Sequence, residues 1–248
     1  MSLNQSTIRE LLAAVPLFAG DDTAVLDELL KNSQLVEPDK GNLLFTQGEK
    51  ADFLYVVLSG WVKLFRETGD GHEAIAGLCT HGDLFGEAVL YQKSQYPFSA
   101  EAASDSIVLR IPAEVIRQRI HKDGGFAARL LQAVSQRLNA MELHMEHLTV
   151  MTAPQRIGCF LLKLCRSKGN QNIKILLPYD KTLVAAFLGI KLETFSRSLV
   201  QLREFGVNVE GPQVTIESIE KLQKYVCGSC SFDFGECQAD KKTPSESE

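Results

Sequence analysis

The chain has 248 residues, 45% of them hydrophobic and 23% charged, and its formal net charge is −5. This length accommodates two domains with separate cores, and the composition is that of a folded globular protein, which excludes a disordered or fibrous chain. No apolar run approaches the roughly 20 residues of a membrane-spanning helix, and no basic cluster leads the apolar stretch near the N-terminus, so we expect a cytoplasmic protein without a membrane partner.

The charges are unevenly distributed along the chain. Residues 1–152 hold 13 Lys and Arg against 20 Asp and Glu, residues 153–225 hold 11 against 6, and residues 226–248 hold 2 against 5. Only the second segment is basic, with a net charge of +5. A basic segment in an acidic protein is the sign expected of a module that contacts nucleic-acid phosphates.

The N-terminal half begins with two short predicted helices, residues 6–15 and 21–32, the second capped by Asp21 or Asp22. Short β-type runs then alternate with glycines, and we expect strands at residues 43–45, 53–58, 61–65, 75–78 and 107–111. Many short strands with glycine at the corners are typical of a small closed or rolled β-barrel. The Asp-Gly pair at residues 70–71 suits the turn of one hairpin.

The middle of the chain is predicted to form one long helix, from about residue 126 to residue 149. Its apolar residues fall at alternating spacings of four and three, the a/d pattern of a coiled coil, and they are Ala127, Leu131, Val134, Leu138, Met141, Met145 and Leu148. This narrow stripe favours a parallel homodimer; a helix packed only inside its own domain is the alternative. Met at two of these positions makes the contact adaptable.

The last part of the chain has the pattern of a winged helix-turn-helix. We expect, in order, a helix from Pro154 to Leu164, a strand at residues 173–177, a helix capped by Asp180, a turn at Gly189, a second helix at residues 191–205 closed by Gly206, and a hairpin at residues 207–216. The hairpin would form the wing beside the second helix.

The second helix of this motif carries the predicted DNA contacts. Its apolar residues fall on one face, and Glu193, Ser196 and Arg197 lie on the opposite face. Arg can donate two hydrogen bonds to guanine, Glu can accept one from cytosine, and Ser is short enough to approach a base edge. The alternative is a solvated ion pair between Glu193 and Arg197 on the helix surface. We expect Lys191 to contact phosphate, and Thr194 completes the predicted DNA-binding set.

Residues 183–197, LVAAFLGIKLETFSR, resemble the recognition motif of the cyclic AMP receptor protein and fumarate-nitrate reductase regulator (Crp/Fnr) superfamily of transcription regulators. The sensor-domain pattern of that superfamily is also matched in order and spacing, by Gly41 and by residues 47–49 (QGE), 58–60 (LSG) and 82–87 (GDLFGE). Within the superfamily the chain looks most like the nitric-oxide-responsive branch, the dissimilatory nitrate respiration regulators, through residues 193–197 and 85–88.

The resemblance implies an α+β fold in four parts. These are a cyclic-nucleotide-binding-like β-barrel (double-stranded β-helix) at residues 1–125, a dimerisation helix at 126–150, a winged helix-turn-helix at 151–226 and a tail at 227–248. It also implies a homodimer that binds double-stranded DNA at inverted repeats with TTGAT-like half-sites. RNA polymerase is implied as a further partner, and the protein is not expected to be an enzyme.

The chain departs from the resemblance where a cyclic nucleotide would bind. Members of the superfamily that bind cyclic nucleotides hold the phosphate with an Arg-Ser pair, and residues 96–99 (YPFS) stand in that place. Without the Arg the phosphate loses its bidentate partner, so a cyclic nucleotide is not expected. The predicted effector pocket retains Gly86, Glu87 and Ser99. The N-terminal cysteines of the oxygen-sensing branch are missing, because the first cysteine is Cys79.

Haem is the first of two remaining sensing chemistries, and it is implied by the resemblance. The available ligands are Cys79, His72, His81, His121, His144 and His147. None lies in a motif that fixes a ligand: each histidine is more typical of an exposed side chain, and Cys79, Cys159 and Cys165 are more typical of packing.

A metal centre on the tail is the second chemistry. Cys227 and Cys230 are separated by two residues, and Cys237 follows, so three thiolates are available for an iron–sulfur cluster or zinc. A flexible, redox-labile tail is the alternative. A rival function from another class, a cupin-like metal enzyme or small-molecule carrier, is disfavoured, because the barrel region offers only His72 and His81 with no ligand spacing.

Overall fold

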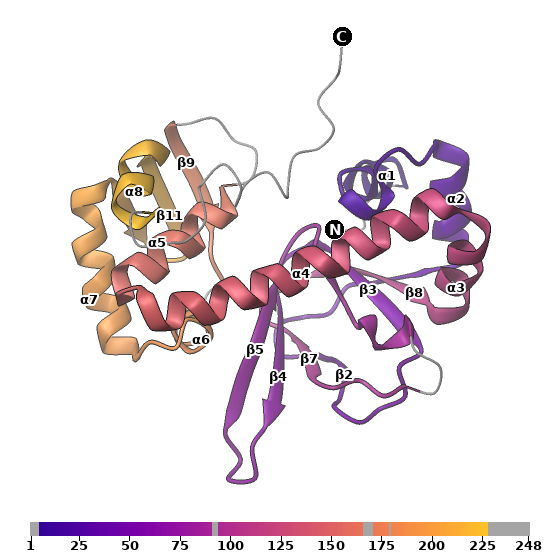
Figure 1. Ribbon diagram of the computed structural model, residues 1–248, viewed down its shortest axis with the longest axis horizontal. Coiled ribbons are helices and arrows are strands. Elements are labelled where there is room, and N and C mark those ends of the chain that lie inside the picture. The colour runs from indigo at the N-terminus through magenta and orange to yellow at the C-terminus, as the bar shows by residue number, and fades with distance from the viewer. Residues whose placement is uncertain (1–4, 91–93, 166–170, 179, 228–248) are drawn as a thin grey trace. The chain divides into compact units, whose positions relative to one another are not determined.

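The structure, a computed structural model, describes residues 5–90, 94–165, 171–178 and 180–227. The chain divides into two compact units, Met1–Ser135 and Gln136–Glu248, and the division falls inside the long helix α4 (Gly124–Val150) (Figure 1). No helix in the described part of the chain is long and apolar enough to cross a membrane.

The first unit opens with two helices, α1 (Gln5–Ala13) and α2 (Thr23–Lys31), joined by a short 3₁₀ turn, η1 (Pro16–Phe18). Both predicted helices are therefore confirmed. Asp22 is the cap of α2, because its carboxylate accepts a 2.8 Å hydrogen bond from the backbone N–H of Val25.

Asp21, the other candidate cap, has a different role. Its side chain is 5% exposed, accepts a 2.8 Å hydrogen bond from Arg129 Nη2 and forms an ion pair with Arg119 Nη2 at 2.6 Å. Arg119 belongs to α3 (Ala113–Lys122) and Arg129 to α4. A buried carboxylate shared by two arginines thus ties the N-terminal helices to the helices that follow the barrel.

Eight strands form two four-stranded antiparallel sheets with the orders β1-β8-β3-β6 and β2-β7-β4-β5. The strands are β1 (Gln34–Val36), β2 (Leu43–Phe45), β3 (Phe53–Ser59), β4 (Val62–Glu67), β5 (Glu73–Cys79), β6 (Leu84–Phe85), β7 (Ser99–Ala102) and β8 (Ile107–Pro112), with a 3₁₀ turn η2 (Glu87–Leu90) between β6 and β7. The rolled β-barrel and its five predicted strands are confirmed. The strands β1, β6 and β7, of two to four residues each, were not predicted.

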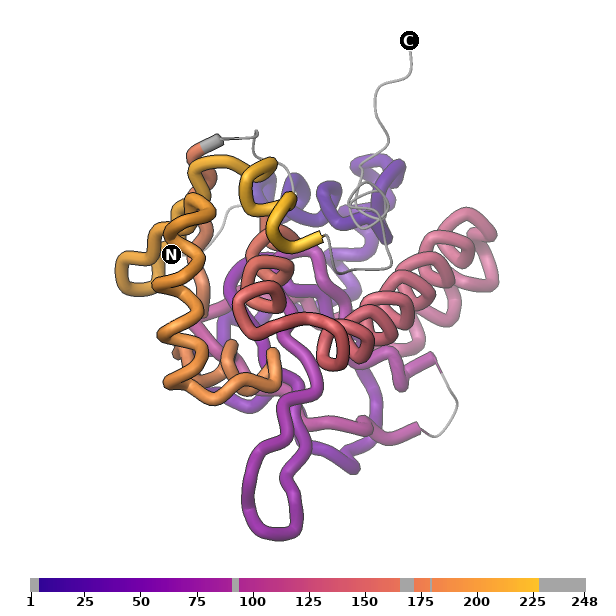
Figure 2. Tube along the Cα trace, turned by 60° about the vertical axis from the view of Figure 1, so that its left-hand side comes forward, coloured from indigo at the N-terminus to yellow at the C-terminus, as the bar shows by residue number. Residues whose placement is uncertain are grey.

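The β4–β5 hairpin extends beyond the rest of the roll in both views (Figures 1 and 2). Its turn contains the predicted Asp-Gly pair, and Gly71 has φ +81°, a left-handed conformation that favours glycine. At the base of the hairpin, Lys63 Nζ lies 2.7 Å from Glu73 and 3.2 Å from Glu101. These two carboxylates raise the pKa of Lys63 against the opposing effect of its burial.

The second unit contains the end of α4 and a winged helix-turn-helix. Its elements are α5 (Ala153–Leu164), β9 (Gln171–Leu176), α6 (Lys181–Phe187), α7 (Leu192–Leu202), a 3₁₀ turn η3 (Arg203–Phe205), β10 (Val207–Glu210), β11 (Gln213–Ser218) and α8 (Ile219–Val226). The predicted wing is confirmed as the β10–β11 hairpin, with β9 on the other side of β11. The second motif helix was predicted to reach residue 205, but α7 ends at Leu202 and a 3₁₀ turn continues to Gly206, whose φ is +81°.

The apolar stripe of α4 is exposed. The exposed fractions are 68% for Leu131, 57% for Leu138, 47% for Met141, 68% for Met145 and 42% for Leu148, and Ala127 and Val134 are half-buried. The predicted seam is therefore an uncovered apolar surface within one chain. A second face was not predicted: Leu143 and His147 are 8% and 4% exposed and pack inside the second unit.

Candidate nucleic-acid interface

The helix-turn-helix is fixed by local interactions that the sequence indicated. The Asp180 carboxylate caps α6 by accepting a 2.8 Å hydrogen bond from the Thr182 N–H. The turn glycine, Gly189, has φ +63°, and a Cβ at this position would lie 3.0 Å from Leu148 Cδ2. Both the backbone angle and the close approach therefore require glycine between α6 and α7.

The helix α7 has one buried face and one exposed face. The buried residues are Phe195, Ser198, Leu199 and Leu202. The predicted base-reading residues Glu193, Ser196 and Arg197 are all exposed, as is Lys191 at the N-cap. Thr194 is half-buried, so it is less exposed than these four residues. The sequence therefore placed the exposed face of this helix correctly.

The alternative role for Glu193 and Arg197, an ion pair along the helix, does not form. Within the described ranges, no ion pair or hydrogen bond joins the Glu193 carboxylate to the Arg197 guanidinium. Both groups are left to solvent or to another molecule. A carboxylate and a guanidinium projecting from one exposed helix face are the groups that read cytosine and guanine edges.

Two exposed apolar side chains on α7 were missed. Leu192 is 44% exposed and Val200 is 58% exposed. Val200 follows Glu193 by seven residues and therefore lies on the same helix face, a periodicity that was available in the sequence. Apolar side chains at a DNA-facing surface suit the methyl group of thymine.

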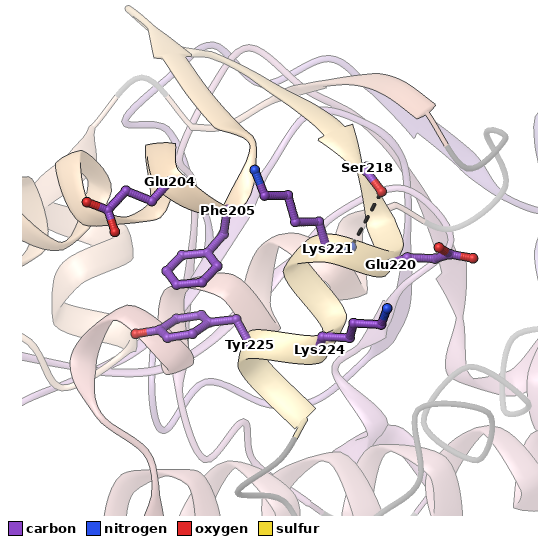
Figure 3. Close-up of a pocket in the computed structure, with 7 residues that line it drawn as sticks. All are labelled: Glu204, Phe205, Ser218, Glu220, Lys221, Lys224 and Tyr225. Carbon is purple, nitrogen blue, oxygen red and sulfur yellow. Dashed lines mark hydrogen bonds between the residues drawn. The ribbon is translucent and has the colours of Figure 1, made fainter.

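A surface pocket of about 450 Å³ lies on another side of this unit (Figure 3). It is lined by Glu204, Phe205, Ser218, Glu220, Lys221, Lys224 and Tyr225. The rings of Phe205 and Tyr225 are stacked, with centroids 3.8 Å apart. None of the predicted DNA-binding or effector residues lines this pocket.

The three predicted effector residues occupy well-packed positions in the sensor roll. Gly86 has φ +83°, and a Cβ there would lie 3.0 Å from the Phe53 carbonyl oxygen. The Ser99 hydroxyl accepts a 3.0 Å hydrogen bond from the backbone N–H of Gln47. Glu87 is half-buried at the start of η2. Ser99 thus joins two distant segments of the roll.

Aromatic rings fill the interior beside Gly86. Phe45 and Tyr96 stack with centroids 3.7 Å apart, and Tyr55 and Phe85 stack at 4.9 Å. The Tyr96 hydroxyl donates to the Phe53 carbonyl at 2.8 Å and accepts from the Phe53 N–H at 3.0 Å. Burial raises the pKa of both tyrosine hydroxyls, which keeps them neutral donors.

The segment that replaces the Arg-Ser pair of cyclic-nucleotide binders is also engaged within the chain. The Arg66 guanidinium lies 4.6 Å from the centroid of the Phe98 ring. Arg66 Nε donates to the Pro97 carbonyl at 2.9 Å. The Arg66 guanidinium is thus engaged by the Phe98 ring and the Pro97 carbonyl of this segment.

The histidine expectations need correction at two positions. His72, His81 and His121 are exposed as expected, but His147 is buried and His144 is half-buried. Both lie on the second face of α4, which the a/d pattern did not reveal. Burial and the charge of Lys163 lower the pKa of both, that of His147 to about 4.

The cysteines agree in part with expectation. Cys79 and Cys165 are buried, and burial raises the pKa of the Cys165 thiol to about 11; Cys159 is half-buried. Cys227 is half-buried at the end of α8, and the other two predicted metal ligands, Cys230 and Cys237, lie outside the described residues. Across the described part of the chain, no three His, Cys, Asp or Glu side chains are grouped to hold a metal.

A β-roll sensor domain followed by a long helix and a winged helix-turn-helix defines a DNA-binding transcription regulator with an effector-binding domain. Sequence comparison agrees: the cyclic nucleotide-binding domain family matches residues 35–123, and the Crp-like helix-turn-helix domain family matches residues 155–225. The chain belongs to the Crp/Fnr family of transcription regulators.

Individual relatives are similar to this chain over most of its length. The cyclic AMP receptor protein of Thermus thermophilus is 33% identical over 197 residues, which are 79% of this chain and 89% of that protein. The structure of FixK2 from Bradyrhizobium japonicum is 26% identical with a TM-score of 0.68, covering 77% of this chain and 96% of that one. DNR from Pseudomonas aeruginosa is 31% identical with a TM-score of 0.50, covering 91% of this chain and all of that one.

Proposed function

We propose that the protein works as a homodimer that reads an inverted repeat in double-stranded DNA. The observation that carries the proposal is the exposed a/d stripe of α4, where Leu131 and Met145 are each 68% exposed. Large apolar side chains in a regular stripe are costly in water and are covered when two such helices pair. A two-fold axis along this seam would present two copies of α7 to successive major grooves.

The proposed base reading uses the exposed face of α7. Arg197 donates to guanine N7 and O6, Glu193 accepts from cytosine N4, and Ser196 approaches a base edge. Lys191 contacts phosphate, and the exposed side chain of Leu192 suits a thymine methyl group. This set fits TTGAT-like half-sites, which contain one guanine and several thymines.

Substitution of Arg197 by Ala tests this assignment. The change should cost about 1 to 3 kcal/mol on the cognate inverted repeat and flatten discrimination at one guanine per half-site. Arg203→Ala is the matched control, because Arg203 is exposed in η3 just beyond α7. Fluorescence anisotropy with cognate and guanine-substituted duplexes measures both effects.

Two outcomes would contradict the base-reading proposal. In one, Arg197→Ala retains the parent ratio between cognate and scrambled duplexes; in the other, Arg203→Ala loses discrimination to the same degree. Footprinting adds a geometric test, since a two-fold dimer should protect half-sites about 34 Å apart between centres. At a promoter, the DNA-bound dimer would contact RNA polymerase, a proposal that rests on membership of a family of transcription regulators.

The proposed signal is nitric oxide or a redox change, received through haem or an iron–sulfur cluster. Its support is the likeness to DNR over 91% of the chain and the three thiols at Cys227, Cys230 and Cys237. The described residues do not by themselves fit haem: stacked aromatic rings occupy the interior of the roll, and the His81 imidazole is bonded through Nδ1 to the Leu58 carbonyl at 2.8 Å. The tail thiols are of the type that holds clusters or zinc.

Anaerobic metal analysis with an absorption spectrum separates these chemistries. A tail cluster should give iron and acid-labile sulfide that are lost in a Cys227→Ser, Cys230→Ser double variant that still binds DNA. Haem should instead give a Soret band that shifts with nitric oxide and survives that double change. Both chemistries would be contradicted if the protein showed no haem or cluster absorption after reconstitution with haem and with iron and sulfide, and bound DNA equally with and without nitric oxide.

The cupin-like enzyme or carrier has less support. The relatives that match along both domains are transcription regulators. His72 and His81, the histidines of the roll, are both exposed rather than directed together into its interior. This alternative would be favoured if the full-length Cys227→Ser, Cys230→Ser variant still bound a metal and the protein did not retain duplex DNA.

A further inference from the structure

The second face of α4 joins this helix to the helix-turn-helix through an aromatic stack. The His144 imidazole lies over the Phe187 ring at the end of α6, with centroids 4.8 Å apart and planes inclined by 11°. The Phe160 ring of α5 approaches the same Phe187 ring at 6.0 Å. A nearly parallel pair at this distance is a favourable stacking geometry.

Neighbouring contacts fasten the same two turns of α4. His147 is 4% exposed, and its Nδ1 lies 3.8 Å from Cys159 Sγ on α5. Leu148 reaches the turn glycine, Gly189, so closely that a Cβ there would lie 3.0 Å from Leu148 Cδ2. The end of α4 therefore packs against α5 and against the turn between α6 and α7, within one compact unit.

The exposed seam occupies the adjoining face of these same turns. Met141, Met145 and Leu148 belong to the seam, and His144 lies between them in sequence but about 40 to 100° away from each of them around the helix at 100° per residue. The seam determines where a second copy would bind, and the stack determines where α6 and α7 lie relative to that seam. Because both faces belong to the same turns of α4, this one helix would fix the angle between the dimer axis and α7.

We propose that His144 is a positioning residue for operator binding: its imidazole, stacked on Phe187, holds the helix-turn-helix at the angle to the dimer helix that fits the half-site spacing. The inference rests on the proposed dimeric DNA reading. It assigns His144 a part in the geometry of the complex without any contact to DNA.

The surroundings of His144 favour the uncharged ring. Lys163 and Arg156 of α5 both act to lower its pKa, in addition to burial, which is the largest cause. From α6 it faces the apolar Phe187 ring, and its hydrogen bond to the Phe187 backbone acts in the opposite sense, raising the pKa by less than the other causes lower it. On α4 itself its titratable neighbour is His147. A proton on His144 would place a third positive charge close to those of Lys163 and Arg156. Operator binding should therefore weaken as pH falls below 6.5.

The test compares three full-length variants on a full inverted repeat and on a single half-site. His144→Ala removes the stack, His144→Phe keeps a flat ring but cannot be protonated, and His121→Ala is the control at an exposed histidine. His144→Ala should bind the full repeat about tenfold more weakly, because each of two subunits loses an aromatic contact worth a few-fold. Its affinity for the single half-site should stay within about twofold of the parent.

The Phe variant supplies the decisive readouts. His144→Phe should restore affinity for the full repeat at pH 7.5 and show a flatter loss between pH 7.5 and 5.0 than the parent or His121→Ala. Equal weakening of the full repeat and the half-site by His144→Ala, or a Phe variant with the parental pH profile, would overturn the proposal. If His144→Ala does not fold, the Phe comparison alone decides. Failure of the parent itself to prefer the inverted repeat would instead overturn the proposed dimeric function.

Discussion

Polar groups inside the sensor roll have hydrogen-bond partners within the chain, whereas several polar and apolar groups on the surface of the DNA-binding unit have none in the described residues. In the roll, the Tyr96 hydroxyl is bonded twice to Phe53 and the Ser99 hydroxyl is bonded to Gln47. In the second unit, Glu193 and Arg197 project from α7 with no ion pair in the described chain, and the part of the α4 seam that it contains, Leu138, Met141, Met145 and Leu148, is exposed.

This difference separates groups that the fold itself satisfies from groups that need another molecule. A side chain with its partners inside the chain contributes to folding stability. An exposed, unpaired side chain contributes little to folding and is available for association. Substitutions in the roll should therefore change unfolding, and substitutions on α4 or α7 should change assembly or DNA binding while leaving unfolding nearly unchanged.

The largest expected effect is on assembly, from Leu138→Asp. Two carboxylates brought into one apolar seam should weaken the dimer by about 5 kcal/mol or more, because each would be desolvated without a partner. Sedimentation should show monomers at concentrations where the parent is dimeric, and binding to the inverted repeat should be lost. Leu176→Asp is the matched control, since Leu176 is 68% exposed on β9 and outside the seam.

A Leu138→Asp protein that remains dimeric and binds DNA normally would break the comparison. It would mean that the stripe is an ordinary exposed surface and that α4 serves only its own domain.

The next largest effect should come from Tyr96→Ala inside the roll. Removing the ring leaves a cavity beside Phe45 and deprives the Phe53 backbone of two hydrogen bonds, so unfolding of the sensor domain should become easier by about 3 to 5 kcal/mol. Thermal and urea unfolding measure this loss. Discrimination between cognate and guanine-substituted duplexes, taken below the melting temperature, should be unchanged. Altered discrimination would show that the two regions are not separable in this way.

Acid should destabilise the second unit through His147. Its pKa is lowered to about 4 in the folded protein from an ordinary value of 6.5, so the unfolded chain binds more protons between these values. Stability is therefore fully present above pH 6.5 and falls by about 3 kcal/mol as pH falls to 4. Urea unfolding at several pH values should show a shallower dependence for His147→Gln than for the parent, and identical slopes would exclude this source.

A smaller effect in the roll is expected from Tyr96→Phe. This variant retains the stacked ring and removes only the hydroxyl that bridges the Phe53 N–H and carbonyl, so the loss should be about 1 to 3 kcal/mol. The difference between Tyr96→Ala and Tyr96→Phe separates the contribution of the ring from that of the hydrogen bonds. Equal losses in the two variants would mean that ring packing contributes nothing.

The smallest effect should be that of Lys191→Ala on DNA binding. An exposed Lys at the N-cap of α7 that meets phosphate should weaken cognate and scrambled duplexes alike and lower the salt dependence by about one unit per subunit. Salt titrations of both duplexes measure this. A selective loss on the cognate duplex would instead identify Lys191 as a base contact.

The exposed faces of helices could be predicted from the sequence, because they follow from the helical spacing of nearby residues. The exposed stripe of α4 follows from a spacing of four and three, and the exposed face of α7 follows from a spacing of three and four between Glu193, Ser196 and Arg197. The caps at Asp22 and Asp180 and the turn at Gly189 are equally local, because each involves residues no more than three positions apart or a single backbone angle. These features define the class of protein and its candidate DNA-reading surface.

Contacts between residues far apart in the sequence became visible only in the tertiary structure. Tyr96 bonds to Phe53, 43 residues away, and this pairing lies beside Gly86, one of the three residues that the sequence assigned to an effector pocket. The second face of α4 is buried because α5 and α6 pack onto it, so His144 and His147 are not the exposed histidines that were expected. Helical and strand periods determine which side of an element is apolar, whereas burial depends on which other element covers each side, and that is fixed only when residues far apart in sequence pack together.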